Sequence, residues 1–171
     1  MKIIEGMKKL RVIEKRMEKN MEGISKYSSL LNTERPYFET EDRQKQEVKS
    51  LIQANTDLME EYLELKKNLE YTNLSVTLEL GGKKYSISEL LVLKRKMARS
   101  MIETYESLNA RSANMRLSSS RVRGEDKTPQ AIRLYKEEDK NAGLGKWQDI
   151  YDNIDSRLEV LNATEDMHEM K

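Results

Sequence analysis

The chain has 171 residues, with 31 Lys and Arg against 30 Asp and Glu, no Cys and one His. The absence of cysteine excludes disulfide scaffolds, cysteine-ligated zinc sites and thiol catalysis, and it is typical of the reducing cytoplasm, where we expect this protein to reside. A charged fraction of 36% with 6% aromatic residues is typical of long helices rather than of compact enzymes. No stretch approaches about 18 consecutive apolar residues, so we expect no membrane segment.

Residues 1–73 are predicted to form a long antiparallel helical hairpin of the coiled-coil type. Apolar residues recur at spacings of three and four over residues 3–31, and again over residues 48–69. Pro36 separates the two runs, because proline cannot continue a helix. Asn55 lies on the second apolar seam, where we interpret it as a polar residue that fixes the register of the hairpin.

A short β-hairpin is predicted over residues 74–88. Apolar and polar residues alternate on both sides of Gly81-Gly82, which is typical of two strands joined by a tight turn. Ser86 is followed three residues later by Glu89, a pair that predicts a capped helix start. We therefore expect a helix over residues 89–115.

The remaining chain is predicted to be a loop followed by helices. The apolar period is lost over residues 116–128, a basic segment rich in Ser, Arg and Gly. A Thr-Pro pair then predicts a helix start, and we expect C-terminal helices over residues 129–164, interrupted at Asn141–Gly145. Residues 165–171 are expected to be a frayed tail. The predicted fold is a single, mainly α domain over residues 1–171: a long antiparallel coiled-coil helical hairpin, two or three further helices and one small β-hairpin.

Several patches of sequence carry a resemblance to a known family. They are Tyr71–Leu74, Gly82, Ile87–Leu91 leading into Lys94–Lys96, and Ile154-Asp155 followed by Leu158–Thr164. Through them the chain resembles the septicolysin-like family of small helical bacterial and phage proteins, whose function is unsettled. The resemblance implies a long helical hairpin, a small β element and returning helices. The chain departs from the family pattern over residues 118–145, which are longer and more basic.

The sequence predicts no catalytic or metal centre. His168 is the only histidine, so neither a Ser-His-Asp triad nor a site with several histidine ligands can form. Asp149, Asp152 and Asp155 recur at three-residue spacing. They could bind a metal or act as a base, but we interpret them as an acidic stripe that pairs with a basic neighbour. We therefore expect a protein that is not an enzyme and that has no cofactor and no metal.

The net charge of +1 conceals an uneven distribution. Residues 83–123 hold ten basic residues against three acidic ones, whereas residues 124–171 hold seven against twelve. Arginine binds phosphate through its planar fork, and serine hydroxyls supply further donors. The basic part therefore predicts an anion site; the alternative is a solvated loop that pairs with the acidic last helix. The candidate ligand-binding residues are Arg111, Arg116, Ser118, Ser119, Ser120, Arg121, Arg123 and Lys127, with Tyr135 and Trp147 as rings for stacking on a base.

Two function hypotheses follow. The first is a non-enzymatic homo-oligomer that binds an anionic, nucleotide-like small molecule, on the general plan of phage anti-defence sponges that sequester a cyclic or other signalling nucleotide. The second is a coiled-coil structural or adaptor protein that binds another protein, which the long seams and ten methionines favour. Nucleic-acid binding is disfavoured, because five net acidic charges follow the basic part directly.

Overall fold

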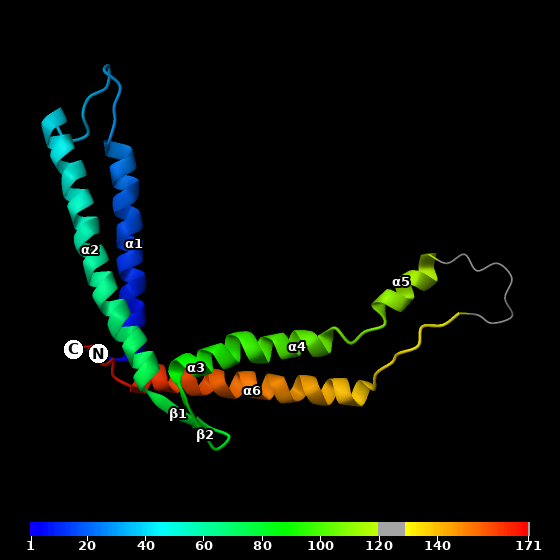
Figure 1. Ribbon diagram of the computed structural model, residues 1–171. Helices are drawn as coiled ribbons and strands as arrows, with labels where there is room; N and C mark the ends of the chain where they lie inside the picture. Colours follow the sequence, from blue (N-terminus) through cyan, green and yellow to red (C-terminus); the bar gives the residue numbers. More distant parts are fainter. Residues whose placement is uncertain (120–128, 171) are drawn as a thin grey trace. The chain divides into compact units, whose positions relative to one another are not determined.

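The computed structural model describes residues 1–119 and 129–170. It is mainly α with one two-stranded antiparallel sheet, which confirms the predicted fold class (Figure 1). Two compact units are present. The first combines Met1–Ile87 with Val160–Lys171, and the second is Ser88–Glu159.

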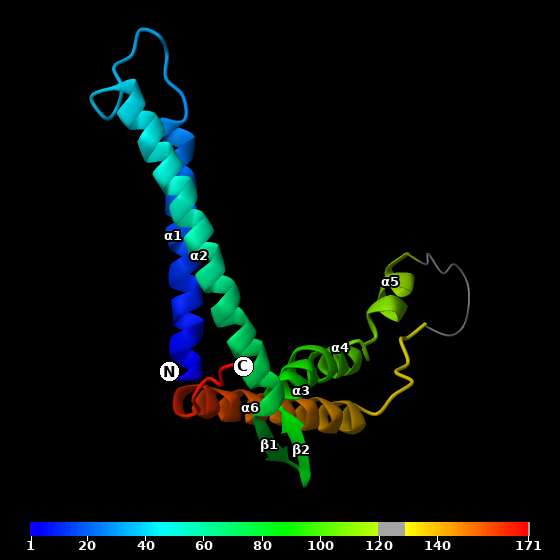
Figure 2. The ribbon, with the colours of Figure 1, turned by 60° about the vertical axis from the view of Figure 1, so that its left-hand side comes forward.

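The first unit is built on α1 (Ile3–Tyr27) and α2 (Glu41–Ser75), which lie side by side as a hairpin (Figures 1 and 2). The pairing is antiparallel, because the start of α1 contacts the later part of α2. The Lys9 ammonium lies 2.7 Å from the Glu61 carboxylate, and further along α1 the Asn20 side chain contacts Asn55, which comes earlier in α2, at 2.9 Å. At 1.5 Å per residue, α2 is about 52 Å long.

The connection between α1 and α2 is held by aromatic rings and one buried amide. The Tyr27 ring meets the rings of Tyr37 and Phe38 edge-on, at centroid distances of 5.3 and 4.9 Å. The Gln44 side chain is 3% exposed and bonds to the backbone on both sides, accepting from the Tyr37 N–H and donating to the Tyr27 carbonyl, each at 2.8 Å. These contacts explain why α1 ends at Tyr27, about five residues earlier than the apolar pattern predicts.

Asn55 lies in the seam, as predicted, and pairs with the opposite helix. The Asn20 side chain donates to the Asn55 oxygen at 2.9 Å, and the Asn55 amide donates to the Met17 carbonyl at 3.3 Å. Every polar group of a buried amide needs such a partner, and the two helices supply it only in one alignment.

The buried core of the first unit is confined to one end of the hairpin. Its buried apolar side chains, together with the buried Thr72, are Ile3, Leu10, Ile13, Leu65, Leu69, Ile87 and Leu161. Nearer the connection, the seam side chains are only half-buried, and Met21 is 55% exposed. Much of the hairpin therefore has an incomplete core.

The predicted β-hairpin is confirmed. β1 (Thr77–Leu80) pairs antiparallel with β2 (Lys83–Ser86), and Leu80 lies opposite Lys83. Gly81 and Gly82 form the two-residue turn with φ of 59° and 77°. Positive φ at both positions is the requirement of a primed turn that glycine meets without strain.

The second unit contains a continuous helix made of three stretches. α3 (Ile87–Val92) leads into a π-helical stretch, η1 (Leu93–Ala98), and then α4 (Arg99–Glu106). α6 (Glu137–Thr164) runs beside this helix in both views (Figures 1 and 2). The buried side chains of this unit are Leu90, Ala98, Ile154 and Leu158.

The π-helical stretch changes which residue faces the core. The apolar spacing predicts Met97 on the inner face, but Met97 is 53% exposed and Ala98 is fully buried. Hydrogen bonds from i to i+5 place more residues in a turn than an α-helix has, which rotates the later residues around the axis. Within η1 the inner position therefore moves from Met97 to Ala98, whereas Met101 and Tyr105 of α4 remain half-buried on the predicted face.

The predicted helix over residues 89–115 is not continuous, because it ends at Glu106 and residues 107–110 are not helical. The Ser107 hydroxyl donates to the Glu103 carbonyl at 2.8 Å, and the Asn109 side chain accepts from the Arg111 N–H at 2.9 Å. Side-chain bonds of this kind satisfy backbone groups outside a continuing helix.

A separate helix, α5 (Arg111–Ser119), follows this break. The predicted loop over residues 116–128 is therefore wrong at its start, because residues 116–119 are helical. The Asn109 side chain caps the start of α5, a feature that the spacing of apolar residues does not reveal.

The C-terminal helix begins later than predicted and has no break. Residues 129–136 are not helical, and α6 continues through Asn141–Gly145. Its first turn holds Glu137, Glu138 and Asp139, and acidic side chains stabilise the amino end of a helix. The glycines are accommodated inside the helix.

Candidate functional site

Four predicted ligand-binding residues lie on α5, and three of them are described as exposed: Arg111, Arg116 and Ser118. The Ser118 hydroxyl donates to the Met115 carbonyl of its own helix at 2.8 Å. Five residues separate the arginines, and at 3.6 residues per turn this places them on different sides of α5. The described part of α5 therefore does not direct both arginines toward one ligand.

The other basic and hydroxyl candidates fall at the end of the described segment or beyond it. Ser119 is the last residue of α5. Ser120, Arg121, Arg123 and Lys127 lie outside the described residues. Their role in binding an anion stays a prediction.

The two candidate stacking rings each lie near a lysine of α6. The Tyr135 ring centroid is 5.9 Å from the Lys140 ammonium, and the Trp147 ring centroid is the same distance from the Lys146 ammonium. Partial burial, together with the hydrogen bond from its hydroxyl to Glu137 at 3.1 Å, raises the pKa of Tyr135. A base that stacked on the lysine side of either ring would displace a cation–π contact.

The acidic stripe of α6 pairs with a basic neighbour through Asp155. Asp155 accepts from the Lys94 ammonium, and the Lys94 side chain is only 16% exposed. The same ammonium lies 4.9 Å from the Tyr151 ring centroid. This contact confirms the pairing interpretation for Asp155. Over residues 1–119 and 129–170, no three acidic or histidine side chains are grouped as metal ligands.

An apolar row of side chains lies on the outer surface of α2, beside the seam with α1. It consists of Val48, Ile52, Met59 and Leu63, which we call the α2 face. Spacings of four and seven residues place all four on one side of the helix. Ile52, Met59 and Leu63 are 52%, 51% and 53% exposed, and Val48 is half-buried. The spacing of apolar residues predicts the seam and places Ile52 and Met59 beside it. A helical projection of the whole of α2 would have shown that the four residues form one row.

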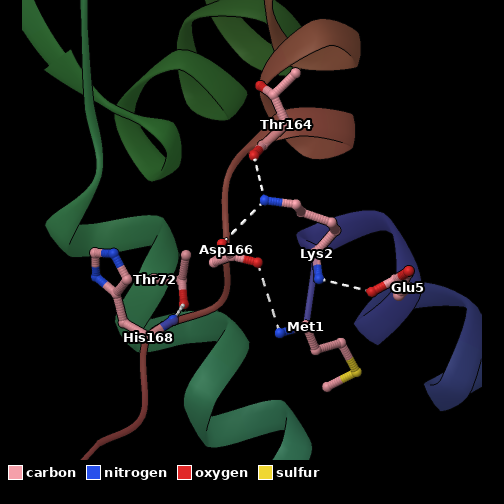
Figure 3. Close-up of polar contacts among 7 residues, drawn as sticks. All are labelled: Met1, Lys2, Glu5, Thr72, Thr164, Asp166 and His168. Carbon is pink, nitrogen blue, oxygen red and sulfur yellow. Dashed lines mark hydrogen bonds and ion pairs between the residues drawn. The ribbon is translucent and has the colours of Figure 1, made fainter.

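The last described residues are ordered against the start of the chain, so the predicted fraying is wrong. Figure 3 shows the Lys2 ammonium between the Thr164 carbonyl, at 2.8 Å, and the Asp166 carboxylate, at 2.9 Å. The Met1 amino group lies 3.6 Å from the same carboxylate. The hydrogen bond from Lys2 is the main cause of a lowered pKa at Asp166. A backbone hydrogen bond also joins the two ends of the chain, because the Ile3 N–H donates to the Glu165 carbonyl at 3.1 Å.

The same C-terminal segment also contacts the end of α2. The His168 N–H donates to the Thr72 hydroxyl at 2.8 Å (Figure 3). His168 Nδ1 lies 2.8 Å from the Ser75 hydroxyl. The imidazole also meets the Tyr71 ring edge-on at 6.4 Å. No carboxylate of the described chain bonds to this imidazole, so a Ser-His pair is present without the acidic group that orients a triad. The geometry supports a structural contact.

In comparisons with known proteins, the chain matches no family model, no curated protein and no solved structure. Among the described helices, none combines the length and the apolar content needed to span a bilayer. The class that the fold defines is a mainly α protein with a two-helix hairpin, and the α2 face is a row of exposed apolar side chains on that hairpin.

Proposed function

We propose that this chain is a non-enzymatic structural or adaptor protein that works by helix-to-helix association through its hairpin. The observation that supports the proposal is the α2 face, where three apolar side chains are about half exposed beside an incomplete seam. Exposed apolar side chains along one side of a helix are typical of an interaction site. A homo-oligomer in the cytoplasm is the form we expect.

The test combines sedimentation of the full chain with oxidative footprinting of its methionines. We expect assemblies that grow with protein concentration, and oxidation of Met59 that falls several-fold as they form. Met115 on α5 is 63% exposed and serves as the matched control, with unchanged oxidation. A chain that stays monomeric, and whose Met59 is oxidised equally in buffer and in extract of its own cells, would overturn the proposal.

A second candidate function is the binding of an anionic, nucleotide-like small molecule, as in a sponge that sequesters a signalling nucleotide. Exposed Arg111 and Arg116, next to the basic residues predicted to share the site, favour it. Calorimetric titration with cyclic and linear nucleotides tests it. We expect Arg111→Gln and Arg116→Gln to weaken binding, whereas Arg133→Gln, at an arginine already paired with Glu137 at 2.9 Å, leaves it unchanged. Absence of heat with every nucleotide would exclude this function.

A further inference from the structure

The apolar row on α2 has the same spacing when read in either direction. Val48, Ile52, Met59 and Leu63 are separated by four, seven and four residues. Two α2 helices that run antiparallel therefore place Ile52 of each opposite Met59 of the other, and Val48 opposite Leu63. Self-complementarity of this kind is what a two-fold symmetric interface requires.

Charges beside the row follow the same symmetry. Lys49 borders the row at one end, and Glu60 and Glu64 border it on the same side at the other end. All three are exposed. In the antiparallel pair, Lys49 of one copy comes level with the interval between Glu60 and Glu64 of the second copy. In a parallel pair, Lys49 would be level with Lys49 of the second copy and more than ten residues along the helix from Glu60, so the opposite charges would not meet. Flanking charges of this kind set helix orientation in coiled coils.

The surface is also hollowed at both ends of the row. A largely apolar pocket of about 370 Å³ lies beside Val48 and is lined by Tyr27, Leu30 and Gln44. A second hollow lies beside Leu63 and is lined by Glu60 and Glu64. The antiparallel pair brings Leu63 of the second copy to the pocket beside Val48, as a knob enters a hole.

We propose that a second copy of this chain covers the α2 face, through an antiparallel pair of α2 helices whose two-fold axis passes between Asn55 and Thr56. This inference rests on the proposed function and names the partner of the same surface. The apolar row supplies the buried contact, and Lys49 with the two glutamates sets the direction of the pairing.

Because the chain has no native cysteine, a cross-linking test can use introduced cysteines as its only thiols. Chains carrying only Ile52→Cys are mixed with differently tagged chains carrying only Met59→Cys, and a short bis-maleimide is added. We expect mixed cross-linked dimers at roughly ten times the yield of each variant alone, because packed helix axes lie about 8–10 Å apart. Ser50→Cys, on the opposite side of α2, replaces Ile52→Cys in the control mixture and gives only background yield.

A charge exchange tests the direction independently. Lys49→Glu is expected to weaken self-association about tenfold. Chains with Glu60→Lys and Glu64→Lys should likewise weaken, and mixing the two variants should restore association. All three positions are exposed, so the monomer should keep its helical circular dichroism.

The outcomes separate the two proposals. A wild-type chain that is monomeric at all concentrations overturns both. A wild-type oligomer that fails to enrich the cross-link between residues 52 and 59 over the control overturns only the α2 pairing, and association through the hairpin then stands. Enrichment of links between identical positions would show a parallel pair and overturn the proposal.

Discussion

Gly143 of α6 lies against the ring of Tyr105 of α4, so closely that a Cβ atom on residue 143 would be 2.3 Å from a ring carbon. Alanine is favoured over glycine inside a helix by about 1 kcal/mol. At position 143 the steric conflict should outweigh this preference, because three ring carbons of Tyr105 lie within 2.7 Å of the Cβ position. We expect Gly143→Ala to destabilise the protein by about 1–3 kcal/mol, measured by urea unfolding.

Gly145 is the control for this prediction, because nothing lies within 4 Å of the Cβ position there. Gly145→Ala, two residues further along the same helix, should therefore raise the unfolding free energy by up to about 1 kcal/mol. Equal effects of the two substitutions would contradict the close packing of Gly143 on Tyr105.

Gln44 should be essential for the connection between α1 and α2. Gln44→Leu removes the partners of the Tyr37 N–H and the Tyr27 carbonyl. Unpaired backbone groups cost about 1–3 kcal/mol, so we expect a loss of stability of this size in thermal and urea unfolding. Gln46→Leu, at an exposed position one half-turn away, should stay within about 0.5 kcal/mol of wild type. Equal losses would show that the amide bonds contribute nothing specific.

Asn20 and Asn55 should be energetically coupled. Each single substitution to alanine leaves one amide without its partner, whereas the double substitution removes both groups. We expect a double-mutant cycle to give a coupling of about 0.5–1.5 kcal/mol in unfolding experiments. Additive effects would show that the hydrogen bond between the two side chains does not stabilise the hairpin.

The contact between Asp166 and Lys2 should be released by acid. The pKa of Asp166 is lowered in the folded state from its ordinary value of 3.8. The stabilisation that the contact between Asp166 and Lys2 provides is therefore fully present above pH 3.8, and it is lost as the pH falls through the lowered pKa of Asp166. We expect amide exchange of residues 165–170 to accelerate below about pH 4, with unfolding of α1 monitored in parallel.

Asp166→Asn is the control for the acid effect. It should accelerate exchange of residues 165–170 already at neutral pH and remove the part of the acid dependence that this carboxylate causes. If the wild type and the variant show the same pH profile, another carboxylate is responsible.

Local sequence signals predicted the elements that form through interactions between residues close in sequence. The hairpin followed from the spacing of apolar residues, and the β-turn followed from Gly81-Gly82. Asn55 could be placed in the seam because a single polar residue in an apolar row stands out. Each of these signals is contained within a few helical turns or a few strand residues.

The break after Glu106 comes from local side-chain bonds at Ser107 and Asn109 that apolar spacing does not reveal. Two other wrong predictions depend on contacts between distant residues. Lys2 and Asp166 are far apart in sequence, and nothing near Asp166 indicates its partner. Gly143 looked like a helix break, because its contact with Tyr105 cannot be read from the residues beside it. The anion site stays a prediction, because most of its residues lie outside the described chain.

The division of the chain has a consequence for its synthesis. The second unit is one uninterrupted stretch, Ser88–Glu159, whereas the first unit needs Val160 and later residues to be complete. At ribosomal rates the intervening stretch takes roughly 4–14 s to emerge. During that interval the nascent α1–α2 hairpin lacks its C-terminal contacts, among them the bond of the Ile3 N–H to the Glu165 carbonyl. The hairpin is therefore open to chaperones or to a neighbouring nascent copy before its own chain is finished.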